Sequence, residues 1–509
     1  MTDREWREGS DTRRATLTLA IIVVAAALLR FWALDAGIPG SLGIDEPQVM
    51  MRSVQMMRSG SLNPHGFFDY PGLYLYMQLF VACVRFLVGA IGGEWTALNE
   101  AQPEDFYLWG RAVTAVLGTL TVLLVYRVGL RWGTRYALLA SALMAVMPLH
   151  VRESHYVLTD VPLTFFVTLA LVCAFDAHER PTLANFARAG AAVGLAAATK
   201  YPGGLSILLP LFVAWMTPGV RPSRAAAALI ACGSALGVFL LAAPYTWLDL
   251  PGFLNGFARL ASVYSAPSEA VWVTYLKHLR LNLHWPAMLL MVAGVVLALV
   301  RVVRGPSRLR WALAVVFPIV YFWFVSRQGL VYGRYLLPIV PFLCILTAAA
   351  VVSGVSLLRR FAIPRAARTA LIAVLTIAVL LPPTVHAIGF NRMINRRNTT
   401  ELAYNWIVTN IPKHSTLVIE TGAVRLPAPY KSRNVRELRE RDVPNYQQEG
   451  VEYLVASSEA FGAYLAAPQK APREYADYMN IFGRTQELVR FAPSDVHPGP
   501  ELRILKIQP

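Results

Sequence analysis

Acidic and basic side chains are sparse in this sequence, and several of them stand next to long apolar segments. Asp45 and Glu46 follow the first such segment, within Gly-Ile-Asp-Glu-Pro at 43–47. Two adjacent carboxylates can act as a general base, ligate a metal ion or pair with an arginine. The alternative is a solvated loop that starts a helix over 48–57, because acidic residues are favourable at a helix N-terminus. Asp45 and Glu46 are the first candidates for catalysis.

Two further aspartates stand where apolar helices are expected to begin. Asp69 and Tyr70 precede a run that also contains Tyr74. These tyrosines can form a wall for a sugar or an isoprenoid, or an aromatic belt at the membrane surface. Asp160, shortly after His155, can line the same site or cap a helix. The substrate-binding candidates are Asp69, Tyr70, Tyr74, His155 and, further along the chain, Tyr201, whereas Asp160 is a catalytic candidate.

Three cations complete this set of charges. Lys200 and Tyr201 lie in Thr-Lys-Tyr-Pro-Gly at 199–203, Arg111 lies inside an apolar segment, and Arg334 follows a Gly-Leu-Val-Tyr-Gly turn. Each cation alone could snorkel to lipid headgroups or pair with an acid. Together, these carboxylates and the three cations map to one membrane surface. That combination suits a ligand with a phosphate and with a hydroxyl that must lose a proton, as in transfer from a lipid-linked phosphate sugar.

The composition shows which kind of fold must position these residues. Of 509 residues, 56% are hydrophobic and 15% are charged, against about 25% charged in soluble domains. The stretches 15–34, 225–246, 335–355 and 369–389 are nearly free of charge and long enough to cross ~30 Å of hydrocarbon as helices. The sequence therefore predicts an α-helical polytopic membrane protein. It excludes a disulfide-stapled secreted domain, a coiled coil and a disordered chain.

The net charge of +16 indicates membrane topology rather than nucleic-acid binding. The arginines gather between apolar segments, as the positive-inside rule describes, so we expect no nucleic-acid partner. The basic loops 127–135, 217–224, 301–310 and 356–368 are assigned to the cytoplasm. The four cysteines all lie in apolar stretches, which indicates neither a disulfide framework nor a cysteine metal site.

Counting the charges in the loops predicts about 11 membrane crossings, within a range of 11 to 13. The N-terminal apolar segment is expected to be kept as the first membrane helix and not removed as a signal peptide, with its N-terminus in the cytoplasm. The run 189–216 has basic flanks on both sides and must be a hairpin, broken at 199–204 by proline and glycine. A full crossing by 71–92 would put the acidic loop 93–106 inside, so this helix is expected to start and end on the outer side. The predicted crossings are 15–34, 107–126, 136–155, 160–176, 189–199, 202–216, 225–246, 284–300, 310–326, 335–355 and 369–389.

The last 120 residues differ completely from the rest. Strand-like runs occur at 416–420, 451–456, 487–491 and 502–507, and a helical pattern covers 400–410. We therefore expect two domains: a transmembrane domain over 1–389, with outer loops 35–106 and 247–283, and a soluble extracytoplasmic α/β domain over 390–509.

The order of these motifs resembles the GT-C superfamily of membrane glycosyltransferases. The resemblance rests on the acidic pair after the first membrane helix, the Tyr-Pro helix start, Leu-Thr-Asp-Val-Pro-Leu-x-Phe-Phe at 158–166, the tip at 199–203 and Gly-Arg-Tyr-Leu-Leu-Pro at 333–338. It covers about 15–355 and is similar to the branch of protein O-mannosyltransferases and the aminoarabinose transferases that modify lipid A. The resemblance implies a polyprenyl-phosphate sugar donor, an extracytoplasmic acceptor and an inner (plasma) membrane location.

The resemblance also implies roles for individual residues. Asp45 would be the base that deprotonates the acceptor hydroxyl, and Glu46 would orient the site or a metal. Arg111 and Lys200 would hold the donor phosphate, with Arg334 as a third phosphate ligand. In the outer loop 247–283, Tyr264 and His278 are second-tier substrate-binding candidates; an interfacial aromatic and basic belt is the alternative.

Several points stay open at this level. The chain has Asp69-Tyr70 where the aminoarabinose transferases carry a Glu-Lys pair, which puts a lipid A acceptor and a zinc site in doubt. No cofactor is assigned, and a divalent metal is left as an alternative. The sugar and the acceptor, whether protein, lipid or cell-envelope glycan, cannot be read. The rival functions are a transporter or lipid flippase, which would show inverted repeats and broken helices at the midplane, and a non-catalytic scaffold.

Overall fold

The computed structural model describes residues 3–38, 45–264, 270–305, 307–358, 364–424, 426, 430–494 and 497–508. Gly43 and Ile44 of the predicted acidic motif, and Arg359 and Arg360 of the last predicted cytoplasmic cluster, lie outside these ranges. The chain divides into two compact units. The first comprises Met1–Leu34 and Asp45–Asn391, and the second comprises Asp35–Ile44 and Arg392–Pro509.

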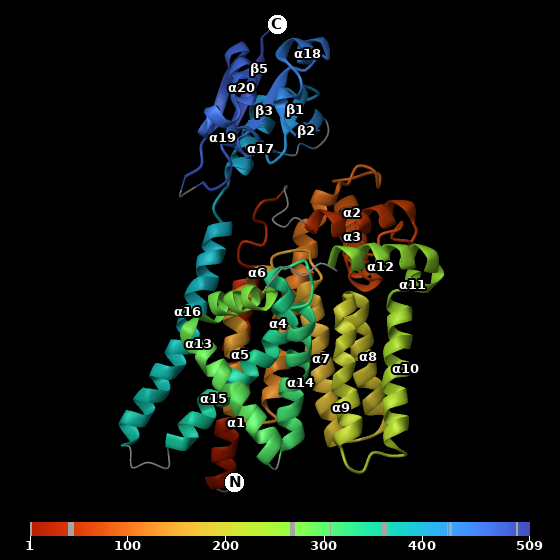
Figure 1. Ribbon diagram of the computed structural model, residues 1–509, viewed down its shortest axis with the longest axis vertical. Coiled ribbons are helices and arrows are strands. Elements are labelled where there is room, and N and C mark those ends of the chain that lie inside the picture. Colours follow the sequence, from red (N-terminus) through yellow and green to blue (C-terminus); the bar gives the residue numbers. More distant parts are fainter. Residues whose placement is uncertain are drawn as a thin grey trace. The chain divides into compact units, whose positions relative to one another are not determined.

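The first unit is a bundle of helices, and each predicted crossing contains one of them (Figure 1). Nine helices of the described residues are long and apolar enough to cross a membrane; this set includes α3 (Gly72–Ile91) but not the shorter α5, α8 and α9. The crossing count itself stays a prediction. The helices in the predicted crossings are α1 (Asp3–Phe31), α4 (Tyr107–Gly129), α5 (Thr134–Val146), α7 (Asp160–Glu179), α8 (Leu183–Thr199), α9 (Leu208–Met216), α10 (Arg224–Ala242), α13 (Val271–Arg304), α14 (Arg308–Val325), α15 (Val340–Leu358) and α16 (Arg365–Ile394).

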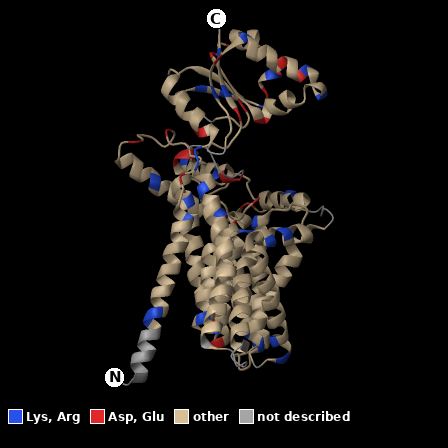
Figure 2. Ribbon diagram, turned by 90° about the vertical axis from the view of Figure 1, so that its left-hand side faces the viewer, with Lys and Arg blue, Asp and Glu red and all other residues tan. Residues whose placement is uncertain are grey.

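Shorter elements connect the long helices. Figure 1 shows α2, α3, α11 and α12 together at one end of the bundle. Figure 2 shows most charged residues of this unit near the ends of the bundle, with few in its middle, as expected for helices in hydrocarbon. The connecting elements are α2 (Glu46–Ser59), η1 (Pro103–Phe106), α6 (Pro148–Glu153), η2 (Tyr201–Ile207), α11 (Tyr245–Leu248), α12 (Leu250–Tyr264) and η3 (Gly333–Ile339).

Two helices of the first unit are interrupted by a change of backbone conformation. Between α8 and η2, Lys200 adopts an extended conformation (φ −156°, ψ 131°) and Pro202 follows in the first turn of η2, so the predicted break in the hairpin is confirmed. In α13, His284 has φ 57° and ψ 168° and Pro286 follows. This backbone conformation is strained for a residue other than glycine. The predicted crossing 284–300 therefore begins at a kink, and 271–283 belongs to the connection before it.

Small residues allow the closest helix packing. A Cβ atom at Gly190 of α8 would lie 2.1 Å from the Ala231 carbonyl oxygen of α10. Helices in membranes associate through such small-residue contacts, because burial of apolar surface provides no driving force between them in lipid.

The second unit contains a five-stranded sheet of order β2-β1-β3-β5-β4. Strand β1 pairs in parallel with β2 and β3, while β5 pairs antiparallel with β3 and β4. Helix α17 (Thr399–Asn410) contributes to the apolar cluster with Leu417 and Ile419, whereas α19 (Ser458–Ala466) and α20 (Pro472–Arg484) contribute to the cluster with Val418. The strands are β1 (Thr416–Glu420), β2 (Lys431–Val435), β3 (Tyr453–Ser457), β4 (Thr485–Phe491) and β5 (Leu502–Ile507), and the short elements are η4 (Leu438–Glu440), α18 (Val443–Gln448) and η5 (Pro468–Lys470).

Candidate active site

A cavity of about 810 Å³ lies within the first unit. Its wall is formed by the start of α2, the residues before α3, η2, the second half of α12, the end of α14 and η3. These segments are far apart in the sequence, and the cavity gathers charged side chains from most of them. The charged residues that line it are Asp45, Asp69, Lys200, Arg259, Arg327 and Arg334.

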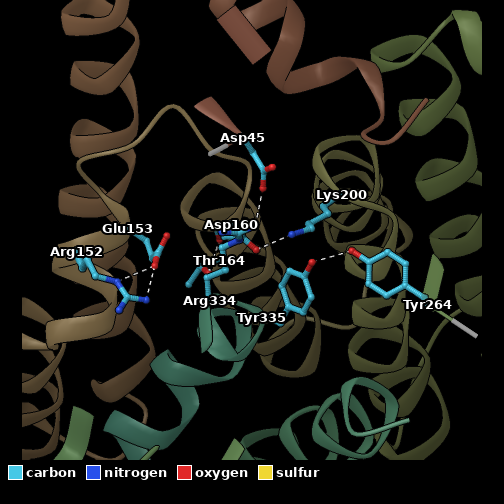
Figure 3. A network of polar contacts seen from close by, with 9 residues as sticks. All are labelled: Asp45, Arg152, Glu153, Asp160, Thr164, Lys200, Tyr264, Arg334 and Tyr335. Carbon is cyan, nitrogen blue, oxygen red and sulfur yellow. Dashed lines mark hydrogen bonds and ion pairs between the residues drawn. The ribbon is translucent and has the colours of Figure 1, made fainter. Parts of the chain in front are cut away.

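Arg334 and Asp160 join the charges on two sides of the cavity into one network (Figure 3). Arg334 Nη2 lies 2.6 Å from Asp45 Oδ2, and Arg334 Nε lies 3.6 Å from Asp160 Oδ2. Lys200 Nζ lies 2.7 Å from Asp160 Oδ1. Asp160 stands directly behind the cavity wall with only 3% of its side chain exposed, whereas 23% of the Asp45 side chain is exposed. Asp45 is therefore the more accessible of the two carboxylates.

The neighbour of Asp45 explains this orientation. Glu46 is fully buried and accepts hydrogen bonds from Arg111 Nε (2.7 Å) and Nη2 (2.8 Å), and from the Val157 backbone N–H (3.1 Å). Successive residues at a helix start project about 100° apart. Because Glu46 is fixed inward on α4 and on the segment before α7, Asp45 projects into the cavity.

The structure corrects the expected roles of Glu46 and Arg111. Both side chains have no exposed surface, and neither lines the cavity. Arg111 also donates from Nη1 to the Leu34 carbonyl oxygen at 2.9 Å. A guanidinium enclosed in this way cannot reach a phosphate in the cavity, and the enclosed Glu46 carboxylate fixes the orientation of Asp45 without lining the cavity itself. The pair instead joins α2 to α4.

Lys200, Tyr335 and Tyr264 form a second line of contacts along the cavity. Lys200 Nζ lies 4.5 Å from the centroid of the Tyr335 ring, a distance typical of a cation–π contact. The hydroxyls of Tyr264 and Tyr335 lie 2.8 Å apart and share a hydrogen bond. Burial is the main cause that raises the pKa of the Tyr264 hydroxyl, so this group stays protonated and can donate to a ligand.

Tyr70 also lines the cavity. Burial raises the pKa of its hydroxyl, and the carboxylates of Asp45 and Asp160 raise it further. Lys200 Nζ lies 5.9 Å from the Tyr70 ring centroid. Tyr70 thus presents a neutral hydroxyl and an aromatic face to the cavity.

Asp69 and Tyr201 connect the site to α12. Asp69 Oδ1 lies 2.7 Å from Arg259 Nη2 of α12. The Tyr201 hydroxyl donates to the Phe68 carbonyl oxygen at 2.9 Å, and its ring packs edge-on against Phe257 of α12. Both residues line the cavity, and both hold α12 as one of its walls.

Three of the predicted substrate-binding residues lie away from the cavity. Tyr74 is buried and its hydroxyl shares a 2.7 Å hydrogen bond with Thr114 of α4. His155 is buried with its ring nitrogens 2.8 Å from the Val151 carbonyl oxygen and 3.0 Å from that of Trp32. His278 packs beside Gly333, next to Arg334 but not in the cavity wall. The structure gives these three side chains packing roles.

Sequence reasoning missed Arg259, Arg327, Tyr335 and Glu153. Arg259 is the cation of α12, and the apolar spacing of 250–264 on both sides of it is the signal that could have found it. Tyr335 directly follows Arg334 within the recognised motif. Glu153, 4% exposed, pairs with Arg152 at 2.6 Å beside the network, and no sequence signal separates it from an ordinary surface acid.

The carboxylates of the site do not fit a divalent metal ion. Asp45 is bonded to Arg334, both oxygens of Asp160 face cations, and Glu46 is enclosed by Arg111. Within the described part of the chain, no group of three His, Cys, Asp or Glu side chains could hold a metal. Metal ligation here would leave Arg334 or Lys200 without its partner.

Comparison with known sequences assigns part of the chain to a family model. Residues 73–248 match the family described as dolichyl-phosphate-mannose-protein mannosyltransferase. Dolichyl-phosphate-mannose–protein mannosyltransferase 1 of Saccharomyces cerevisiae is 28% identical over an alignment of 175 residues, and the match covers 31% of this chain and 21% of the yeast protein. The chain thus matches about a fifth of the length of this curated relative.

Comparison with solved structures covers nearly the whole chain. ArnT from Cupriavidus metallidurans bound to undecaprenyl phosphate superposes with a TM-score of 0.58 at 16% identity, covering 98% of this chain and 99% of that chain. The archaeal oligosaccharyltransferase AglB from Archaeoglobus fulgidus, in complex with an inhibitory peptide and a dolichol-phosphate, gives a TM-score of 0.55 at 13% identity, covering 95% and 74%.

At these identities the structural likeness establishes the fold, while the family match concerns one segment. The expected resemblance to the GT-C superfamily is therefore confirmed for the fold. The chain is a multi-pass membrane protein with the fold of the GT-C glycosyltransferases, and its residues 73–248 carry the sequence pattern of the protein mannosyltransferase family.

Proposed function

We propose that this protein transfers a sugar from a polyprenyl-phosphate donor to an acceptor hydroxyl at the extracytoplasmic face of the plasma membrane. The observation that carries the proposal is the cavity lined together by Asp45, Lys200 and Arg334, in which Asp45 pairs with Arg334 and Lys200 pairs with Asp160. The relatives support the donor class, since the solved structures contain undecaprenyl phosphate or dolichol-phosphate.

Asp45 is the residue best placed to act as the base. One of its oxygens accepts from Arg334, while Oδ1 has no partner among the described residues. In the proposed step the acceptor hydroxyl oxygen attacks the anomeric carbon, and the bond from that carbon to the phosphate oxygen breaks. The hydroxyl proton passes to Asp45 and the electron pair leaves with the polyprenyl phosphate. A positioned base contributes about 100- to 10,000-fold.

Lys200 and Arg334 are the proposed ligands of the leaving phosphate. A lysine ammonium has three donors and an arginine guanidinium has five. The contacts to Asp160 and Asp45 occupy only some of them, so both cations keep donors for phosphate oxygens. Charge accumulates on those oxygens as the bond breaks, and fixed cations there stabilise the transition state more than the ground state.

A transporter or flippase is not favoured by these observations. The relatives found by sequence and by structure are transferases, and the clustered charges lie in one cavity lined by the short elements between the long helices. The second unit is proposed to be extracytoplasmic, on the side of the acceptor.

Turnover by the full-length protein in lipid nanodiscs tests the proposal. Labelled polyprenyl-phosphate sugars are supplied with candidate acceptors, and release of polyprenyl phosphate is measured. Asp45→Asn should reduce turnover at least about 100-fold with little change in thermal stability. Glu104→Gln, which removes a carboxylate of η1 outside the cavity, is the matched control and should leave turnover unchanged. Full activity of Asp45→Asn, or no release from any donor, would overturn the proposal.

A further inference from the structure

Arg327 is a cation of the cavity wall that takes no part in the proposed transfer step. It lines the cavity, its side chain is exposed, and its guanidinium carbon lies 5.1 Å from the Trp323 ring centroid. The other three cations that line the cavity are each paired with a carboxylate. Arg327 forms no ion pair with any residue that the structure describes. Its charge is therefore available to an anion that comes from outside the protein.

The position of Arg327 at the end of α14 places it at the expected surface of the membrane. Ile319 and Trp323 are 49% and 58% exposed, although both belong to the predicted crossing 310–326, so we expect this face of α14 to meet lipid. Residues four apart share a helix face, and Arg327 comes four residues after Trp323, with its N–H bonded to the Phe324 carbonyl oxygen at 3.1 Å. An exposed tryptophan and a long basic side chain at a helix end are typical of the level of the lipid headgroups. Arg327 thus belongs both to the cavity wall and to this membrane surface.

The apolar part of the cavity lining comes mainly from α12 and the end of α14. These two segments are joined directly, because the Gly329 N–H donates to the Tyr264 carbonyl oxygen at 2.8 Å. Two of the apolar lining residues, Phe257 and Val263, are 43% and 55% exposed, so an apolar chain can lie against them. A polyprenyl chain needs such apolar contacts, whereas its phosphate needs cations. The apolar residues that α12 and α14 contribute to the lining are Phe257, Leu260, Ala261, Val263, Phe324 and Val325.

We infer that the lipid donor enters the cavity sideways from the membrane, between α12 and the end of α14, and that Arg327 is the first cation to bind its phosphate. This inference rests on the proposed function. A cation at the level of the headgroups attracts the phosphate and raises the rate of association. The phosphate then passes to Lys200 and Arg334, because two cations hold it more strongly than one. Arg327 therefore acts on binding of the donor and not on the chemical step.

A matched pair of arginine variants tests the inference. Release of polyprenyl phosphate by the full-length protein is measured in nanodiscs that contain the donor at varied mole fraction. Arg327→Gln should lower kcat/KM by about 10-fold through a higher KM, with kcat little changed, and Arg327→Lys should keep most of the activity because it keeps the charge. Arg280→Gln is the control and should change neither constant. Arg280 is also exposed and lies 5.6 Å from the Trp285 ring centroid, but it does not line the cavity.

A donor with a short, water-soluble prenyl chain separates entry from the chemical step. This donor can reach the cavity from water, so Arg327→Gln should impair its use clearly less than that of the long-chain donor. An unchanged KM for the long-chain donor would overturn the inference and leave the transferase proposal intact. A fall in kcat, or an equal loss with both donors, would also overturn it, because Arg327 would then act in the chemical step. No release by the unchanged protein from any donor would instead mark a failure of the proposed function itself.

Discussion

Asp45 and Glu46 show how neighbouring residues of one type acquire different roles. The sequence alone predicted an acidic pair and, as one alternative, an arginine partner. It could not say which carboxylate would take Arg111, because that depends on how α2 is rotated against α4. Glu46 pairs with the buried Arg111, and the Asp45 side chain lines the cavity. The same limit applies to Tyr74 and His155, which have suitable chemistry but are held in the packing.

The Glu46–Arg111 pair should contribute to the stability of the folded protein. Removing one partner of a buried ion pair leaves an unpaired buried charge and costs about 3–5 kcal/mol. We therefore expect Glu46→Gln and Arg111→Met each to lower the unfolding free energy by that order. The unfolding free energy lost by the double variant should be clearly smaller than the sum of the losses of the two single variants. Unfolding of all four proteins in detergent measures the coupling, and additive losses would contradict a direct pair.

A buried glutamate in the second unit should make its stability depend on pH. Glu420 is 2% exposed and accepts from the Leu438 and Ser457 N–H groups and the Tyr478 hydroxyl. Burial is the largest effect and raises its pKa from 4.5 to about 7. The native state thus binds this proton more tightly than the unfolded state, so the contribution is complete below about pH 4.5 and is lost as the pH rises through 7.

The loss between pH 5 and 8 should amount to at most about 3 kcal/mol. Native-state hydrogen exchange of the β1 and β3 amides in the full chain, corrected for intrinsic exchange rates, would measure it. Glu420→Gln cannot ionise and should remove this part of the pH dependence. An equally steep profile in that variant would show that other groups cause it.

At the level of elements, helices and breaks were predictable where the sequence carries a local signal. Proline and glycine marked the break at 199–204, and short strand-like runs rich in Leu, Ile and Val marked β1 and β5 at their observed bounds. Strand β2 was missed because Lys431–Val435 is a polar, mostly exposed edge strand. Helix α12 was taken for part of a loop, since it is too short and too amphipathic to cross a membrane. The segment 136–155 was predicted as one helix, yet it is divided at Pro148 into α5 and α6.

Packing of α8 against α10 gives a sharp prediction at this level. Gly190→Val would place Cβ against the Ala231 carbonyl oxygen, which is backbone and cannot move aside. We expect a loss of about 1–3 kcal/mol or more, seen as a lower melting temperature in detergent. Gly233→Ala in α10 has open space around the added Cβ and should be neutral or slightly stabilising, because alanine favours helix. Equal effects of the two changes would contradict the observed helix contact.

At the scale of the whole molecule, charge counting predicts a topology, and that topology stays a prediction. Hydropathy and arginine clusters predicted the helices of the bundle, and the structure has a helix in each predicted crossing. The convergence of distant charges was predicted only in outline. Asp45, Asp160, Lys200 and Arg334 do meet, but the choice among candidates needed the three-dimensional packing.

The orientation in the membrane can be tested by labelling. A cysteine introduced at Glu100 should react with an impermeant thiol reagent from the extracytoplasmic side, and one at Arg310 only from the cytoplasmic side. The native cysteines lie in apolar segments and provide the background. Labelling of the Glu100 position from the cytoplasm alone would mean that α3 crosses the membrane.

The most direct test of the central claim is a cryo-EM structure of the full-length protein in nanodiscs with a polyprenyl-phosphate sugar. We expect the phosphate in the cavity within about 3 Å of the Lys200 ammonium or the Arg334 guanidinium, with the sugar beside Asp45. A phosphate bound elsewhere in the protein, with this cavity empty at saturating donor, would contradict it.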